Sequence, residues 1–169
     1  MQRIHGTGYV TAITAALAIL PAWLAHMLRP THFLCGIDPL YAGLHSFPEA
    51  EDGRSLRDTA HVAYGHHINA ARAQAVTTVV LPLVEPPEVV LHELGHVLHE
   101  RLGFAPAPEP VTAYAEVDEF EAFAEAFTMA HVPGYAPWDI SLQRLATYRR
   151  RHPDLAPYFT PALGEEAIV

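Results

Sequence analysis

Residues 88–102 have the sequence EVVLHELGHVLHERL, in which apolar residues repeat at the spacing of an α-helix. The β-branched stretch at 75–84 (AVTTVVLPLV) precedes it and predicts a buried strand. Pro86 and Pro87 separate the two segments, and Gly103 lies where a glycine commonly ends a helix. The chain is therefore expected to pass from a buried strand into a long, largely apolar helix.

The same helix carries a His-Glu-x-x-His motif. His92 and His96 are four positions apart and so lie one turn apart on one face. Both rings can then bind one Zn²⁺ through a nitrogen, at about 2.0–2.1 Å. Glu93 can accept a proton from a zinc-bound water, whose pKa the metal lowers to about 7. Gly95 leaves space for a substrate or another backbone. A surface helix with two chance histidines is the weaker interpretation, because this motif follows a buried strand.

A catalytic zinc site keeps three protein ligands and a water, so a third ligand must come from elsewhere. The metzincin pattern would place glycine at position 99 and histidine at position 102, where this chain has His99 and Leu102. That subclass is excluded, and His99 is expected to be an ordinary polar position. Glu121 and Glu125 are better sources, since carboxylates beside an apolar helix stripe are costly unless paired or bound to metal. Spacing alone leaves both open.

The two segments together resemble the anthrax-lethal-factor-like zinc metallopeptidases, a group of gluzincins. That family has an H-E-[LF]-G-H helix, then a tyrosine, then an E-F-F-A-E-A-F-like helix. This chain has HELGH at 92–96 and EAFAEAF at 121–127. The resemblance covers mainly residues 75–131. It implies that Glu121 is the third zinc ligand, that the hydroxyl of Tyr114 stabilises the oxyanion, and that Glu125 supports the ligands from outside.

The resemblance also implies a zincin-like α+β fold, with a small sheet packed against an active-site helix and a glutamate-bearing helix. The expected function is that of a zinc-dependent metalloendopeptidase with one Zn²⁺ per chain, acting on a peptide or protein substrate with Glu93 as general base. The alternative is a non-catalytic zincin-like binding or structural module, which could be membrane-anchored. The presence of Glu93 argues against that alternative, since a structural zinc site needs no base and closes with a fourth ligand.

Composition narrows the partners. The chain has 169 residues and a formal net charge of −9 at pH 7, which disfavours binding to nucleic acid or anionic lipid. Its single cysteine, Cys35, cannot form an internal disulfide and excludes thiolate zinc fingers. The sequence leaves the oligomeric state open.

The apolar run at 10–28 has two interpretations. Its length reaches the range of about 17–25 residues that a membrane-spanning helix needs, and Arg3 ahead of it is also typical of a signal peptide. Pro21 divides the run, however, which favours one helix up to Leu20 and a second helix opening at the proline. Trp23 and Leu24 should then be buried. A cytoplasmic location is favoured over secretion or anchoring.

These observations divide the chain into three parts: a docked apolar helical segment at 1–30, the catalytic domain at 31–160, and a tail at 161–169. Within the domain we expect short strands at 31–37 and near 61–64, the second inside an otherwise irregular stretch at 41–72. Two further helices are expected at about 116–131 and 138–151. The three prolines after His152 predict an extended end.

Overall fold

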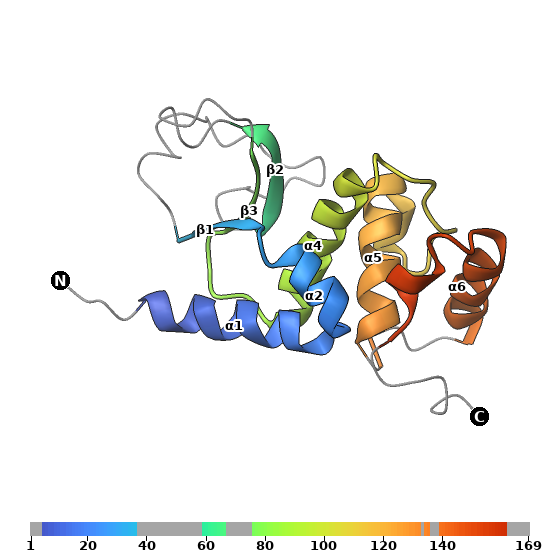
Figure 1. Ribbon diagram of the computed structural model, residues 1–169, viewed down its shortest axis with the longest axis horizontal. Helices are drawn as coiled ribbons and strands as arrows, with labels where there is room; N and C mark the ends of the chain where they lie inside the picture. Colours follow the sequence, from blue (N-terminus) through green and yellow to red (C-terminus); the bar gives the residue numbers. More distant parts are fainter. Residues whose placement is uncertain (1–4, 37–58, 67–75, 133, 136–138, 162–169) are drawn as a thin grey trace.

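The computed structural model describes residues 5–36, 59–66, 76–132, 134–135 and 139–161. This part contains five α-helices, two short 3₁₀ helices and a three-stranded sheet, so the mixed α+β class is confirmed. Most of the stretch expected to be irregular, and nearly all of the tail at 161–169, lie outside the described residues. Figure 1 shows the sheet toward one end of the molecule, helix α4 beside it, α5 next, and α6 at the opposite end.

The sheet has the strand order β1-β3-β2 and is mixed. Strand β1 (His32–Cys35) runs parallel to β3 (Val76–Leu81), whereas β2 (His61–His66) runs antiparallel to it. The central strand β3 is buried through Val79 and Leu81, as its β-branched sequence predicts. All three strands were expected from the sequence, and β1 and β3 are shorter than the stretches that predicted them.

Helix α4 (Pro87–Arg101) begins after β3 and matches the helix expected at 88–102. Pro87 occupies the first turn, where its missing N–H costs nothing. Gly103 follows the helix with a φ of +67°, the left-handed conformation in which glycine commonly ends a helix. Residues 90–99 are all buried, because α4 lies among α1, the sheet and α5. The motif is therefore in the interior of the molecule.

Helix α5 (Glu119–His131) begins three residues later than the sequence suggested. The side chain of Asp118 accepts hydrogen bonds from the backbone N–H groups of Phe120 and Glu121, each at 2.8 Å, and so fixes the helix start. The preceding residues form a separate 3₁₀ turn, η1 (Tyr114–Glu116). Because of this start, Glu121 lies in the first turn of α5, where the helix dipole favours a negative charge.

Helices α4 and α5 approach very closely at Gly95. A Cβ atom added there would lie 2.9 Å from the Cα of Ala124 and 3.2 Å from the ring of Phe127. A glycine is thus required because the backbone of α5 comes so close. The sequence suggested this reason for Gly95, beside the alternative that a substrate approaches there. Its absence of a side chain brings the motif face of α4 against the glutamate face of α5.

The N-terminal helices α1 (His5–Ile19) and α2 (Ala22–Leu28) both pack on α4 and contribute to the same core. Leu24 is fully buried, as expected, but the expectation for Trp23 is wrong: this side chain is 47% exposed. Only one face of α2 meets the core, and Trp23 lies off that face, with its ring edge-on to Tyr158 at 5.4 Å. No helix in the described ranges has both the length and the apolar character needed to cross a bilayer.

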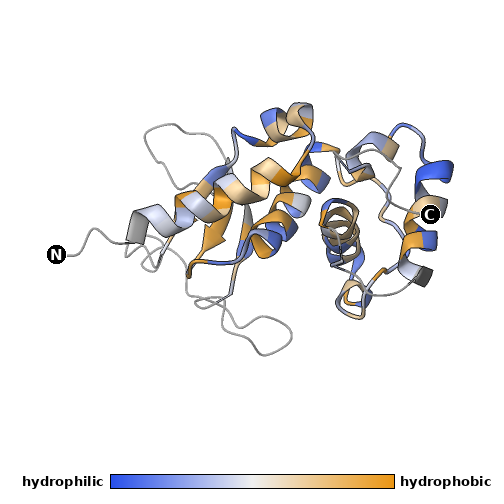
Figure 2. Cartoon of the chain, turned by 90° about the horizontal axis from the view of Figure 1, so that it is seen from below, coloured by the Kyte–Doolittle hydropathy of each residue, from blue (hydrophilic) through white to orange (hydrophobic). Residues whose placement is uncertain are grey.

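The C-terminal part contains α6 (Asp139–Arg151) and the 3₁₀ turn η2 (Ala156–Phe159). The expected extended conformation after His152 is therefore wrong up to residue 161. The side chain of Phe159 is fully buried and meets the rings of Phe123 and Tyr148 at 5.1 Å, which holds the turn against α5 and α6. In Figure 2 the hydrophobic colour of α1 is concentrated in the half nearer the centre of the molecule, whereas the end that carries α6 alternates between hydrophilic and hydrophobic segments.

Candidate metal centre

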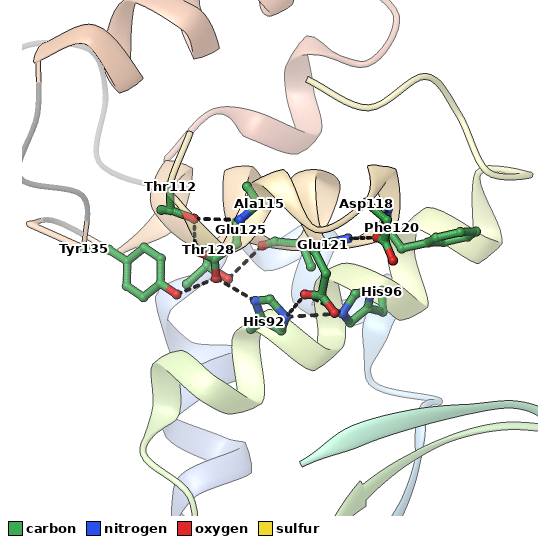
Figure 3. A network of polar contacts seen from close by, with 11 residues as sticks. His92, His96, Thr112, Ala115, Asp118, Phe120, Glu121, Glu125, Thr128 and Tyr135 are labelled. Atoms are coloured by element: carbon green, nitrogen blue, oxygen red, sulfur yellow. Dashed lines mark hydrogen bonds and ion pairs between the residues drawn. The ribbon is translucent and has the colours of Figure 1, made fainter. Parts of the chain in front are cut away.

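Three side chains from α4 and α5 converge on one point (Figure 3). The Nε2 atoms of His92 and His96 are 3.2 Å apart. An Oε2 atom of Glu121 lies 2.9 Å from the Nε2 of His92 and 3.6 Å from that of His96. This is the arrangement expected for Glu121 as the third ligand.

The spacing of these atoms fits a zinc ion. Tetrahedral ligands at about 2.0–2.1 Å from Zn²⁺ are separated from one another by roughly 3.3 Å. The three separations, at 3.2, 2.9 and 3.6 Å, lie around that value. The donor set of two imidazoles and one carboxylate is also typical of catalytic zinc, which leaves its fourth position to water. The donor types and their separations therefore suit a zinc ion.

Glu125 supports His92 from the opposite side. Its Oε1 atom accepts a hydrogen bond from the Nδ1 of His92 at 2.9 Å, so it occupies the outer position that the sequence suggested. The hydroxyl of Tyr135 donates to the same oxygen at 2.7 Å, and the hydroxyl of Thr112 donates to Oε2 at 2.6 Å. Glu125 is 4% exposed. It is thus a buried carboxylate whose charge is satisfied by three donors.

The electrostatics of the metal-free centre follow from these contacts. Burial alone would lower the pKa of His92, but its hydrogen bonds to Glu121 and Glu125 raise that pKa to about 10. Burial would raise the pKa of Glu121, and its contacts with the two histidines hold it well below its usual range. A proton on the Nε2 of His92 therefore bridges to Glu121. A metal ion would take the place of that proton, which is how metal binding and proton release are coupled.

Glu93 lies next to the ligands, on the same turn of α4. It is 5% exposed, and its Oε2 atom has no hydrogen-bond partner among the described residues. Burial raises the pKa of this carboxyl, while the neighbouring His92 and His96 act in the opposite direction. Burying a carboxylate oxygen without a hydrogen-bond partner costs free energy, and in native proteins such atoms often have a catalytic role. It is available to a water molecule or to a reacting group.

A cavity of about 440 Å³ adjoins the ligand cluster. Its lining includes His92, Glu93 and Tyr114, together with Thr59 and Ala60, which directly precede β2. The ring of Tyr114 lies 5.9 Å from that of His92, between ring centroids. The structure therefore brings every residue that the sequence singled out, His92, Glu93, His96, Tyr114 and Glu121, to one place.

His99 was expected to be an ordinary polar position, and this is wrong. The residue is 1% exposed, its ring stacks on Phe123 with 4.3 Å between centroids, and its Nε2 donates to the carbonyl of Ala105 at 2.7 Å. Burial lowers its pKa. It does not join the ligand cluster. His99 instead ties the loop after α4 to the aromatic side of α5.

Sequence reasoning missed Thr112 and Tyr135. Both lie outside the α-helices and strands, so no periodic pattern indicates which way they point. The only available signal was that a supporting carboxylate at Glu125 would need further donors when buried.

Comparisons of this chain with family models, curated proteins and solved structures find no match.

Proposed function

We propose that this chain is a zinc-dependent metalloendopeptidase with a zincin-like domain, similar to the lethal-factor-like gluzincins. The observation that carries the proposal is the convergence of His92, His96 and Glu121 beside the buried Glu93, whose Oε2 atom has no hydrogen-bond partner among the described residues. A purely structural metal site would need a fourth protein ligand and no base. The combination of three ligands, an adjacent carboxylate and a cavity is better suited to hydrolysis.

A bound Zn²⁺ would supply Lewis acidity, acidifying a water and polarising the scissile carbonyl. Glu93 accepts a proton from the attacking water and returns it to the leaving amine nitrogen. Its buried position, beside the cluster and in the lining of the cavity, suits both steps. The hydroxyl of Tyr114 donates a hydrogen bond to the carbonyl oxygen as negative charge develops there. The substrate backbone lies in the cavity between Tyr114 and the entrance to β2.

The test is a digest of a peptide library by the purified chain, with metal content measured in parallel. Glu93→Gln should retain the metal and lose about 10²–10⁴-fold in hydrolysis, because the amide cannot accept the proton. Glu100→Gln is the matched control, a glutamate on the same helix that does not line the cavity. Equal activity of Glu93→Gln and the parent would exclude Glu93 from the reaction. A chain that binds zinc and cleaves nothing would favour the non-catalytic module instead.

A further inference from the structure

The two histidines of the metal cluster are supported unequally. His92 donates its Nδ1 hydrogen to Glu125, whereas the buried Nδ1 of His96 has no partner within the part of the chain that the structure describes. Zinc-binding histidines usually donate their second ring N–H to a neighbouring acceptor, which fixes the orientation of the ring. In this centre the hydrogen bonds around Glu125 therefore fix the orientation of the His92 ring.

The hydrogen bonds in this network can run in only one direction. An ionised carboxylate accepts and cannot donate, so His92, Tyr135 and Thr112 must all donate to Glu125. His92 thus keeps its proton on Nδ1, and when the metal is bound its Nε2 presents a lone pair to the cluster. Without its two hydroxyl donors, the carboxylate of Glu125 would be free to turn away from His92.

Thr112 also acts on a second part of the site. Its hydroxyl accepts a hydrogen bond from the backbone N–H of Ala115 at 3.1 Å while it donates to Glu125. Ala115 belongs to the η1 turn and directly follows Tyr114. One hydroxyl therefore joins the turn that carries Tyr114 to the carboxylate that orients His92. Tyr135, by contrast, is joined to this network through its hydrogen bond to Glu125.

We propose that Thr112 and Tyr135 are positioning residues of the metal centre, and that Thr112 in addition couples the Tyr114 turn to His92. The proposal rests on the metal-binding part of the proposed function and not on hydrolysis. Both residues act through Glu125, and neither belongs to the cluster of His92, His96 and Glu121 that would hold the metal. Their removal should weaken metal binding while leaving the three ligands in place.

The expected effect on metal affinity is large enough to measure. Loss of an outer hydrogen-bond partner typically lowers metal affinity by about 10–100-fold. Thr112→Val and Tyr135→Phe should each raise the Kd for zinc within that range, and Thr112→Ser should restore it because serine keeps the hydroxyl. Because both act through one carboxylate, the two losses should not add in the double variant.

The experiment uses the full chain, with zinc competed against a chromophoric chelator at fixed pH and the visible spectrum of the cobalt form as a second readout. Thr128→Val and Tyr148→Phe are matched controls. Each removes a buried hydroxyl whose bond goes to a backbone carbonyl, that of Ala124 or Pro106, and not to the cluster. These controls should keep the parental Kd and cobalt spectrum even if they unfold at a lower temperature.

Unchanged Kd values and spectra in both Thr112→Val and Tyr135→Phe would overturn the proposal, and so would a Thr112→Ser variant as weak as Thr112→Val. Should Thr112→Val fail to fold, Tyr135→Phe decides, since it removes only a hydroxyl from a half-buried ring. Zinc binding that depends on Thr112 in a chain without hydrolysis would contradict the proposed function and support this inference. A parent chain that binds no metal would overturn both.

Discussion

His92 and His99 lie on the same face of α4, yet α5 presents carboxylates to the first and aromatic rings to the second. Glu121 and Glu125 raise the pKa of His92 to about 10, although burial alone would lower it. His99 stacks on Phe123, and there burial prevails and lowers the pKa. The pKa values of two histidines on one helix are thus shifted in opposite directions by what α5 places against them.

The contrast shows what a helical repeat can and cannot establish. Spacing decides which side chains share a face, but the partner helix decides what they do there. The polar end of the α4–α5 pair, where His92 meets Glu121 and Glu125, is held by hydrogen bonds. The aromatic end, where His99 stacks on Phe123, is held by ring contacts and burial. Changes at the two ends should therefore separate metal binding from stability.

The largest separation should come from comparing His96→Ala with His99→Gln. His96→Ala removes one of the three proposed ligands and should lower zinc affinity by more than about 100-fold, beyond the range of an outer partner. His99→Gln should retain zinc, because His99 is outside the cluster. Metal content after dialysis against a weak chelator measures both. Equal zinc loss in the two variants would mean that the aromatic end also belongs to the metal site.

The aromatic end should dominate stability. Phe123 is fully buried, and Phe123→Ala should cost about 3–5 kcal/mol in the free energy of unfolding, through lost burial and the cavity that remains. Phe120→Ala is the control from the same helix, and its partly exposed ring should cost much less. Urea denaturation in the presence of a chelator gives both values. A similar cost for the two would show that the His99 stack contributes little.

Gly95 lies between the two ends, and Gly95→Ala should affect both. The added Cβ meets the backbone of Ala124, so the helices must separate, at a cost of about 1–3 kcal/mol. The same movement draws His92 and His96 away from Glu121 and should weaken zinc binding. Gly103→Ala is the control: it strains a positive φ but meets no neighbour within 4 Å in the part of the chain that the structure describes. Denaturation and zinc competition should show a loss of affinity in Gly95→Ala alone.

The smallest effect concerns pH. Because the pKa of His99 is lowered in the folded chain, the unfolded chain takes up more protons as the pH falls below about 6.5. The stability that this residue contributes is thus present above that pH and lost below it, by at most about 1.4 kcal/mol per pH unit for one proton. The stability difference between the parent and His99→Gln should shrink from pH 7 to pH 5. A constant difference would contradict the lowered pKa.

Much of the helix pair could be predicted from the sequence. The apolar repeat, Pro87 and Gly103 predicted α4 to within one residue at each end, and the motif predicted that His92 and His96 would share a face. Spacing could not choose between Glu121 and Glu125, because both lie on the same side of α5. The resemblance made that choice, and the geometry around His92 agrees with it.

Other features depended on tertiary contacts that no local pattern reveals. The prolines after His152 suggested an extended end, but the burial of Phe159 against Phe123 holds the chain in a turn. Trp23 belongs to a short apolar helix whose core face could not be identified from seven residues. Thr112 and Tyr135 are used only because α5 brings Glu125 to them.

The ligand cluster joins residues that are closer in sequence than those that hold α1 to the rest of the core. His92 and Glu121 are 29 positions apart, whereas the bond from the Tyr9 hydroxyl to the Pro82 carbonyl, between α1 and the segment before α4, spans 73. Shorter loops close at a lower entropic cost, and contacts of low sequence separation tend to form first. Helices α4 and α5 are thus expected to meet in the folding transition state before α1 docks. Zinc present during refolding in a stopped-flow measurement should then increase the folding rate itself. A ligand that stabilises contacts already formed in the transition state lowers the barrier to folding.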